Sequence, residues 1–277
     1  MTTPFLLWIA CLGAECAQLS NLLPKAEIES RELAELSGVA AAGPGQYWGV
    51  NDSGHLPALF RFNEAGEVLE QIKIEHARNI DWEAMARDSA GNLYIADIGD
   101  NARRREAYTI YRLSGEGRPS VDGVITFRYE DGVSRNGEAI FAFGGKLYLI
   151  SKEDFGRKAE VFSLELSAPA ADAERRAKRV AVLGIASPVT DVAYSAERKE
   201  IAILTYLGAV LYHFEKEEDL LSPPTGQIPG FFGQCEAVAY TSDGQLLITN
   251  EPGSLWKIPL PPVGEAPAEK TASPDKQ

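Results

Sequence analysis

Short apolar stretches recur along the chain in five copies of one pattern. Each copy begins at a polar residue, runs through an apolar stretch of strand length, turns, and returns through a second apolar stretch. The copies begin 46, 55, 53 and 45 residues apart, at Ser37, Glu83, Glu138, Asp191 and Glu236. A repeat of this length fits one four-stranded blade of a β-propeller.

The segments after each pair of apolar stretches complete the pattern. Turn residues such as the Ser-Asp-Gly of residues 242–244 separate the first two strands, and alternating apolar and polar positions follow as third strands. The last copy lacks a fourth strand, which residues 27–33 could supply. We therefore predict an all-β fold, a β-propeller of five four-stranded blades closed by an N-terminal strand. Six blades and a two-sheet sandwich are the alternatives.

The two ends of the chain differ from this pattern. Residues 5–14 form an apolar run of signal-peptide length, and residues 8–11 are a weak lipobox. We expect a leader over residues 1–24, the propeller over 25–260 and a disordered tail over 261–277. This predicts a periplasmic or secreted protein with no integral membrane segment when mature. The weak lipobox allows a lipoprotein. A cytoplasmic protein with an apolar N-terminal arm is the alternative.

Composition narrows the partners and the cysteine chemistry. The 40 acidic side chains outnumber the 27 basic ones, and the resulting net charge of -13 disfavours nucleic acid and anionic membranes. Cys11 and Cys16 fall in the leader, so its removal would leave Cys235 without a disulfide partner.

Polar residues occupy the same two places in every copy. Because the first two strands of a blade form a hairpin, the start of the first and the end of the second lie at one edge. The second strands end at Asn51, Asp97, Ser151, Thr205 and Asn250, which lie 14, 14, 13, 14 and 14 residues after the five copy starts. We therefore predict two polar rings at one mouth of the central channel, flanked by Asp52, Asp81, Asp100, Asn101, Lys152 and Glu251.

Converging carboxylates repel, so either some are protonated or a cation neutralises them. Oxygen-only ligands favour calcium or magnesium over zinc or copper, and a ring drawn from several blades suits calcium or another hard divalent cation. The predicted ligands are Glu83, Glu138, Asp191, Glu236, Asn51, Asp97 and Asn250. The alternative is structural, with carboxylates that accept backbone hydrogen bonds from the neighbouring blade.

Three further features of this mouth could take part in chemistry. His55 could act as a general base, and Asp100 could also carry a proton. The alternatives are a solvated loop histidine and a turn-forming aspartate. The arginines at 103–105 could attract a phosphate or carboxylate, or could be solvated surface.

Several stretches of the chain resemble known propellers. The stretches that resemble a widespread group of mostly uncharacterised bacterial β-propellers are residues 51–54, 81–86, 94–101, 136–140, 151–152 and 236–240. The Glu-Ala-apolar strand starts are also similar to the Glu-Gly-apolar starts of the SdiA-regulated family, the phytase-like esterases and the gluconolactonase and paraoxonase group. The resemblance implies a divalent ion on the axis held by Glu, Asp and Asn, and in some relatives hydrolysis of lactones or esters. This chain departs from those relatives at Ser37, in having five copies rather than six, and in lacking a histidine dyad.

Two functions follow from these observations. The first is a monomeric module that binds a small molecule, glycan or peptide at the acidic rim, or that serves a structural role. The alternative is a metal-dependent hydrolase of a lactone, ester or phosphoester, with His55 or Asp100 moving the proton.

Overall fold

The structure, a computed structural model, describes residues 23–115, 117–167, 174–185 and 187–261. Nearly all of the predicted leader and tail lie outside these residues. Strands dominate the described chain, and its helical content is the short 3-10 helix η2 (Glu217–Leu221). No helix among the described residues is long and apolar enough to cross a membrane.

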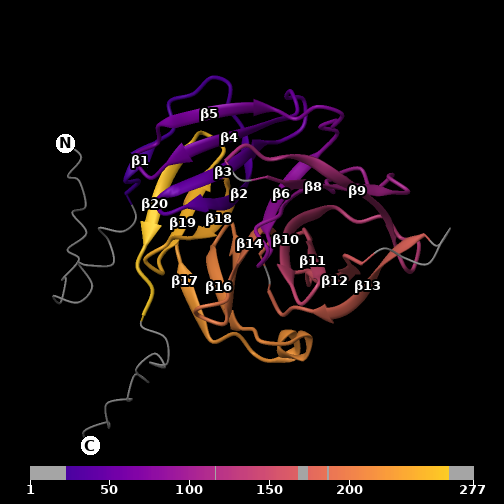
Figure 1. Cartoon of the computed structure of the whole chain (residues 1–277). Helices are drawn as coiled ribbons and strands as arrows, with labels where there is room; N and C mark the ends of the chain where they lie inside the picture. Colours follow the sequence, from indigo (N-terminus) through magenta and orange to yellow (C-terminus); the bar gives the residue numbers. More distant parts are fainter. Residues whose placement is uncertain (1–22, 116, 168–173, 186, 262–277) are drawn as a thin grey trace, which may run out of the picture.

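The strands form four-stranded units in which sequential strands pair in antiparallel fashion (Figure 1). The first unit contains β2 (Leu36–Gly43), β3 (Gln46–Asn51), β4 (Ala58–Asn63) and β5 (Val68–Lys73). The second contains β6 (Trp82–Arg87), β7 (Leu93–Asp97), β8 (Tyr108–Ser114) and β9 (Ser120–Tyr129). The third contains β10 (Gly137–Phe143), β11 (Lys146–Ser151), β12 (Glu160–Glu165) and β13 (Arg175–Val182).

The remaining strands make two more such sheets. The fourth unit contains β14 (Val189–Ser195), β15 (Glu200–Thr205), β16 (Gly208–His213) and β17 (Gly226–Pro229). The fifth contains β18 (Cys235–Tyr240), β19 (Leu246–Asn250), β20 (Ser254–Ile258) and β1 (Ala26–Glu27).

The N-terminal strand closes the fifth unit, as the sequence predicts. Ala26 of β1 lies opposite Leu255 of β20, and the amide of Ile28 donates to the carbonyl of Gly253 at 2.8 Å. The paired segment is two residues long and begins one residue before the predicted range, so closure depends on few hydrogen bonds.

The first strands of the units pack against one another around the middle of the molecule (Figure 1). Each of β2, β6, β10, β14 and β18 packs against its two neighbours in this set, which closes the cycle, and β6 and β14 also contact each other. Their apolar side chains line a hollow of about 100 Å³ on the axis. Within the described residues, a separate apolar core fills the space between each pair of adjacent units. This arrangement confirms the predicted all-β propeller.

One contact between units has no signal in the sequence pattern. The outer strands β9 and β13 pair in parallel, with Arg175 opposite Phe127, so the second and third units join as one eight-stranded sheet. Tyr129 on β9 also packs against Phe162 on β12, with ring centroids 4.6 Å apart. The second and third units are therefore fastened at their outer edges as well as at the axis.

The inner strands lie so close together that a side chain would not fit at one position of β2. A Cβ atom on Gly38 would lie 2.8 Å from the carbonyl carbon of Ala84 on β6. Gly43, at the other end of β2, has nothing within 4 Å of the same position. Glycine at 38 therefore permits the contact between the first two units.

We predict that Gly38→Ala lowers the free energy of unfolding by about 1–3 kcal/mol, the usual cost of overpacking. Gly43→Ala, the matched control on the same strand, should change it by less than about 0.5 kcal/mol. Urea unfolding of the two variants measures the difference. Equal stabilities would mean that the inner strands are not in close contact at Gly38.

Candidate functional site

A β-bulge begins every inner strand. These bulges lie at the end of the ring where the inner strands start and the second strands finish, which we call the mouth. The register shifts by one residue between Trp82 and Ala84 on β6, and the other inner strands show the same irregularity. The extra residues are Ser37, Glu83, Glu138, Thr190 and Glu236. A bulge leaves its extra residue outside the ladder and re-aims its side chain.

The fourth unit departs from the sequence alignment by one residue. Thr190, not Asp191, is the bulged residue that corresponds to Glu236. From its bulged residue Thr190 to Thr205, the hairpin of this unit is one residue longer than the hairpin of the fifth unit. Alignment by residue type therefore pairs the carboxylate of Asp191, rather than Thr190, with Glu236. Asp191 therefore lies one step further along β14.

Three carboxylates meet at the boundary between the first and second units. Asp52 follows β3, Asp81 precedes β6, and Glu83 is the bulged residue of β6. One ligand oxygen from each lies within 4.8 Å of the other two. We call Asp52, Asp81 and Glu83 the acidic trio, and in the described chain no Lys or Arg forms an ion pair with any of them.

Asn79 and Gly99 fix the loops that carry the acidic trio. The Asn79 amide nitrogen donates to the carbonyl of Asp52 at 2.6 Å, while its oxygen accepts from the amide of Trp82 at 3.1 Å. The Gly99 amide donates to the carbonyl of Asp81 at 3.1 Å. A Cβ on Gly99 would overlap the carboxylate oxygens of Asp81 and Glu83, so the absence of a side chain leaves room there.

Burial and mutual repulsion disfavour ionisation of the acidic trio. Glu83 is 7% exposed, and burial followed by the charges of Glu138, Asp52 and Asp81 raises its pKa well above the ordinary range. Burial and the charge of Asp52 also raise the pKa of Asp81. A cation bound here would relieve both effects.

The other side of the mouth contains its own cation, the ammonium group of Lys152. Lys152 Nζ lies 3.1 Å from Glu138 Oε2, and the Asn136 amide donates to Glu138 Oε1 at 2.6 Å. Burial lowers the pKa of Lys152, but the charges of Glu138 and Glu236 outweigh burial and raise it overall. Burial raises the pKa of Glu138 although Lys152 opposes the shift.

Glu236 and Asp191 have different hydrogen-bond donors. The Tyr206 hydroxyl donates to Glu236 Oε1 at 3.1 Å, and burial raises the pKa of Glu236 to about 7 although Lys152 opposes the shift. Asp191 is fully buried, and its Oδ2 accepts from the amide of Val238 on β18 at 2.8 Å. Burial raises the pKa of Asp191 well above the ordinary range. Asp191 thus joins the fourth and fifth units in the way that the structural alternative expects.

The polar side chains at the ends of several second strands hydrogen-bond the backbone of nearby loops. Asn51 Oδ1 and Asn250 Oδ1 accept from backbone amides at 3.2 Å and 2.8 Å. Asp97 accepts two backbone amides of the preceding loop and lies 2.7 Å from the guanidinium of Arg105. These side-chain oxygens are already engaged within the protein, and their role as metal ligands stays a prediction.

The two predicted proton carriers are also engaged. His55 lies in the loop after β3, and its Nε2 is 3.1 Å from Oε2 of Glu35, which precedes β2. Asp100 is buried, and its oxygens accept from the amides of Arg104 and Arg105 and from the Tyr108 hydroxyl at 3.1 Å. Asp100 therefore organises its loop, and the catalytic roles of both residues stay predictions.

A hollow of about 750 Å³ opens beside Lys152 at the same mouth. Loops after β7, β11 and β15 line it, together with residues just before β10 and β14. Its principal lining residues are Arg103, Asn136, Lys152, Phe155, Arg157 and Tyr206, and we call this space the mouth hollow.

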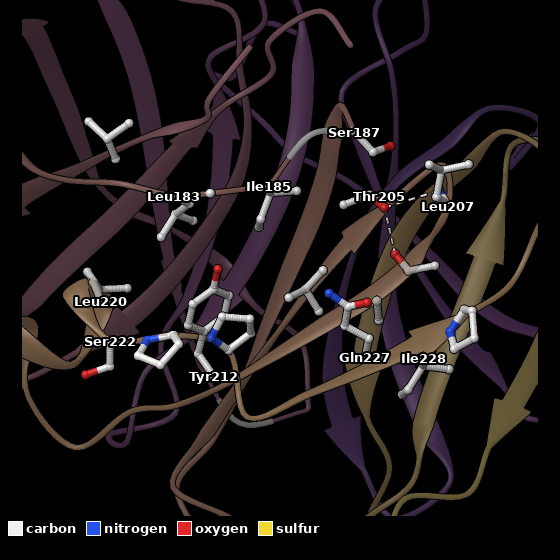
Figure 2. Close-up of a pocket in the computed structure, with 18 of the residues that line it drawn as sticks. Leu183, Ile185, Ser187, Thr205, Leu207, Tyr212, Leu220, Ser222, Gln227 and Ile228 are labelled. Carbon is white, nitrogen blue, oxygen red and sulfur yellow. Dashed lines mark hydrogen bonds between the residues drawn. The ribbon is translucent and has the colours of Figure 1, made fainter. Parts of the chain in front are cut away.

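A second hollow of about 670 Å³ lies along β16 and β17 (Figure 2). Leu183, Ile185, Leu207, Tyr212 and Ile228 are among its lining residues, and no Asp, Glu, His, Lys or Arg lines it. A surface without such groups can bind apolar ligands, but it offers no carboxylate or imidazole to bind a metal or to carry a proton. The candidate site is therefore the mouth.

The raised pKa of Glu236 predicts how stability depends on pH. Burying a neutral carboxyl costs less free energy than burying an ionised one. The protonated Glu236 therefore makes its full contribution to stability below the ordinary glutamate pKa of 4.5, and this contribution is lost as pH rises through about 7. In chelator, the loss of stability between pH 5 and 8 should be smaller in Glu236→Gln than in the wild type by about 3 kcal/mol. Urea unfolding at both pH values measures it.

The exposed Glu197 in the turn after β14 provides the control. Glu197→Gln should reproduce the wild-type pH dependence. If Glu236→Gln loses as much stability as the wild type, Glu236 is ionised throughout this range.

Comparison with known proteins agrees on the fold and leaves function open. No protein-family model matches the chain, and no curated protein matches it. A solved structural genomics protein of unknown function from Bacteroides thetaiotaomicron is similar, with a TM-score of 0.50, 10% identity, and 84% of this chain and 71% of that chain covered.

Two enzymes are among the other similar structures. A glucose dehydrogenase has a TM-score of 0.47 and 15% identity, with 85% of each chain covered. A gluconolactonase from Xanthomonas campestris has a TM-score of 0.43 and 12% identity, with 87% of this chain and 78% of that chain covered. At these identities the likenesses concern the fold alone, so a function must be argued from the residues at the mouth.

Proposed function

We propose that this protein is a five-bladed propeller that holds a divalent cation, calcium by preference, at the acidic trio and binds a ligand at the same mouth. The observation that carries the proposal is the convergence of Asp52, Asp81 and Glu83 with no ion-paired Lys or Arg among the described residues. Each four-stranded unit is taken as one blade, which the closed cycle of inner strands supports.

The spacing of the acidic trio suits a cation of this kind. Calcium binds oxygen at about 2.4 Å, so oxygens on opposite sides of the ion are about 4.8 Å apart. One oxygen from each member of the trio lies within 4.8 Å of the chosen oxygens of the other two. Without a cation, each ionised pair at that distance would repel by at least about 3 kcal/mol at an effective dielectric near 20.

The chemistry of these ligands favours calcium over other metals. The trio supplies carboxylate oxygens alone, which hard cations prefer to soft ones. Its members come from separate loops of two units, and such a site imposes the octahedral geometry of magnesium less readily than the flexible geometry of calcium. Calcium takes six to eight oxygens, so three carboxylates leave positions for water or a ligand.

Lys152 explains why the proposed ligands are fewer than the seven predicted from sequence. Its ammonium group already compensates Glu138 and Glu236, while Asp191 accepts a backbone amide. A second cation beside Lys152 would add repulsion where charge is balanced. The proposed ion therefore lies at the boundary of the first and second units, where Asp52, Asp81 and Glu83 converge.

Metal-dependent hydrolysis of a lactone, ester or phosphoester is the alternative. A bound metal would polarise the substrate oxygen, and Glu236, with a pKa of about 7, has the acidity of a general base that works near neutrality. Turnover of such substrates that stops in chelator, and that Glu236→Gln abolishes, would favour it over simple binding.

Calcium titration by calorimetry of chelator-stripped protein tests the proposal. We expect one ion per chain, and Asp81→Asn should weaken binding at least about tenfold, because even outer-shell changes at metal sites cost that much. Glu138→Gln should weaken it less, since Lys152 and Asn136 already engage Glu138. Asp154→Asn, an exposed acid at the same mouth outside the trio, is the matched control and should bind normally.

Two results would contradict the proposal. If the wild-type protein shows no heat of binding with calcium, magnesium or manganese, it has no such site. If Glu138→Gln lost more calcium affinity than Asp81→Asn, the ion would lie instead in the ring of carboxylates predicted from the repeats.

A further inference from the structure

The mouth hollow differs in charge from the acidic trio across the mouth. Three cationic side chains line it, Arg103, Lys152 and Arg157, against the two acids Glu153 and Asp154. In a protein with 40 acidic and 27 basic side chains, a cavity lined by three cations can still offer a positive group to an anion, provided that one of the three is not paired with an acid.

The cations of the mouth hollow are not equally available. Arg103 lies 2.9 Å from Glu153, and Lys152 lies 3.1 Å from Glu138. The guanidinium of Arg157 has no hydrogen-bond or ion-pair partner among the described residues. A planar guanidinium with free donors binds a phosphate or carboxylate in a bidentate manner.

Apolar surface accompanies these charges. Phe155 is 62% exposed and lines the hollow two residues before Arg157. Tyr206 also lines it, with its ring 5.4 Å from Lys152 Nζ and its hydroxyl held by Glu236. Aromatic faces beside a cationic pocket suit a ligand that has an apolar part as well as an anionic group.

We propose that the mouth hollow binds a small organic anion, with its phosphate, phosphonate or carboxylate group on Arg157 and its apolar part against Phe155 and Tyr206. The hollow of about 750 Å³ is within the usual range for small-molecule sites. This inference rests on the proposed function in that the same mouth holds the cation, and it names the chemical class of the ligand.

Phenylphosphonate is a suitable probe because it has both parts and its P–C bond resists hydrolysis. Calorimetric titration into calcium-saturated protein should show binding that Arg157→Gln weakens about tenfold, the loss of a charge-assisted hydrogen bond. Phe155→Ala should weaken it about threefold or more. Benzyl alcohol, which lacks the anionic group, should not bind.

Arg104→Gln is the matched control. Arg104 is exposed on the same face and its loss changes the net charge equally, but it does not line the hollow. This variant should bind phenylphosphonate as the wild type does. An equal loss in both arginine variants would show a general charge effect and overturn the inference.

The calcium titration separates this inference from the proposed function. Calcium binding without phenylphosphonate binding overturns the inference alone. Phenylphosphonate binding that needs Arg157, in a protein that binds no calcium, supports the anion site and overturns the cation site. Failure of both ligands to bind overturns both.

Discussion

The burial of like charges where the inner strands begin is the constraint on which this site depends. The extra residue of the bulge is a glutamate at three of these starts, and Glu83, Glu138 and Glu236 are each less than a tenth exposed. Unpaired buried carboxylates are costly, so each needs a proton, a hydrogen-bond donor or a cation. How each one is satisfied determines what chemistry the mouth can perform.

The chain satisfies most of these carboxylates by itself. Lys152 compensates Glu138, and Tyr206 donates to Glu236. A backbone amide of β18 bonds Asp191 Oδ2, while Asp191 Oδ1 has no hydrogen-bond partner among the described residues, and burial raises the pKa of Asp191. Asp52, Asp81 and Glu83 remain, close together and without an ion-paired base among the described residues. Under the two proposals, the mouth has one side that holds a divalent cation and a hollow beside it that binds an anion. A ligand that spans the two sides would meet complementary charge at both ends.

The repeats predict the fold well because propeller units impose a regular period on strands and turns, and they place Glu83, Glu138 and Glu236 correctly at one mouth. They do not reveal how each polar side chain is used. Asn51, Asp97 and Asn250 look like ligands by position, yet their oxygens hold loops. Whether a side chain holds a loop or remains available to a ligand depends on loop conformations, which the period of the repeats does not specify. The one-residue displacement of Asp191 also depends on such local conformation. Nothing in the repeat pattern indicates the roles of Asn79, Gly99 and Tyr206 at the mouth. The pattern does place Tyr206 there, since it follows the end of a second strand as Asp52 and Lys152 do.

Crystals grown with calcium, or with terbium in its place, would locate the ion directly by its anomalous scattering. The account predicts a peak between the carboxylates of Asp52, Asp81 and Glu83, with Lys152 still bonded to Glu138. A peak among Glu138, Asp191 and Glu236, with Lys152 displaced, would contradict it, as would ordered crystals in which no ion lies at the mouth.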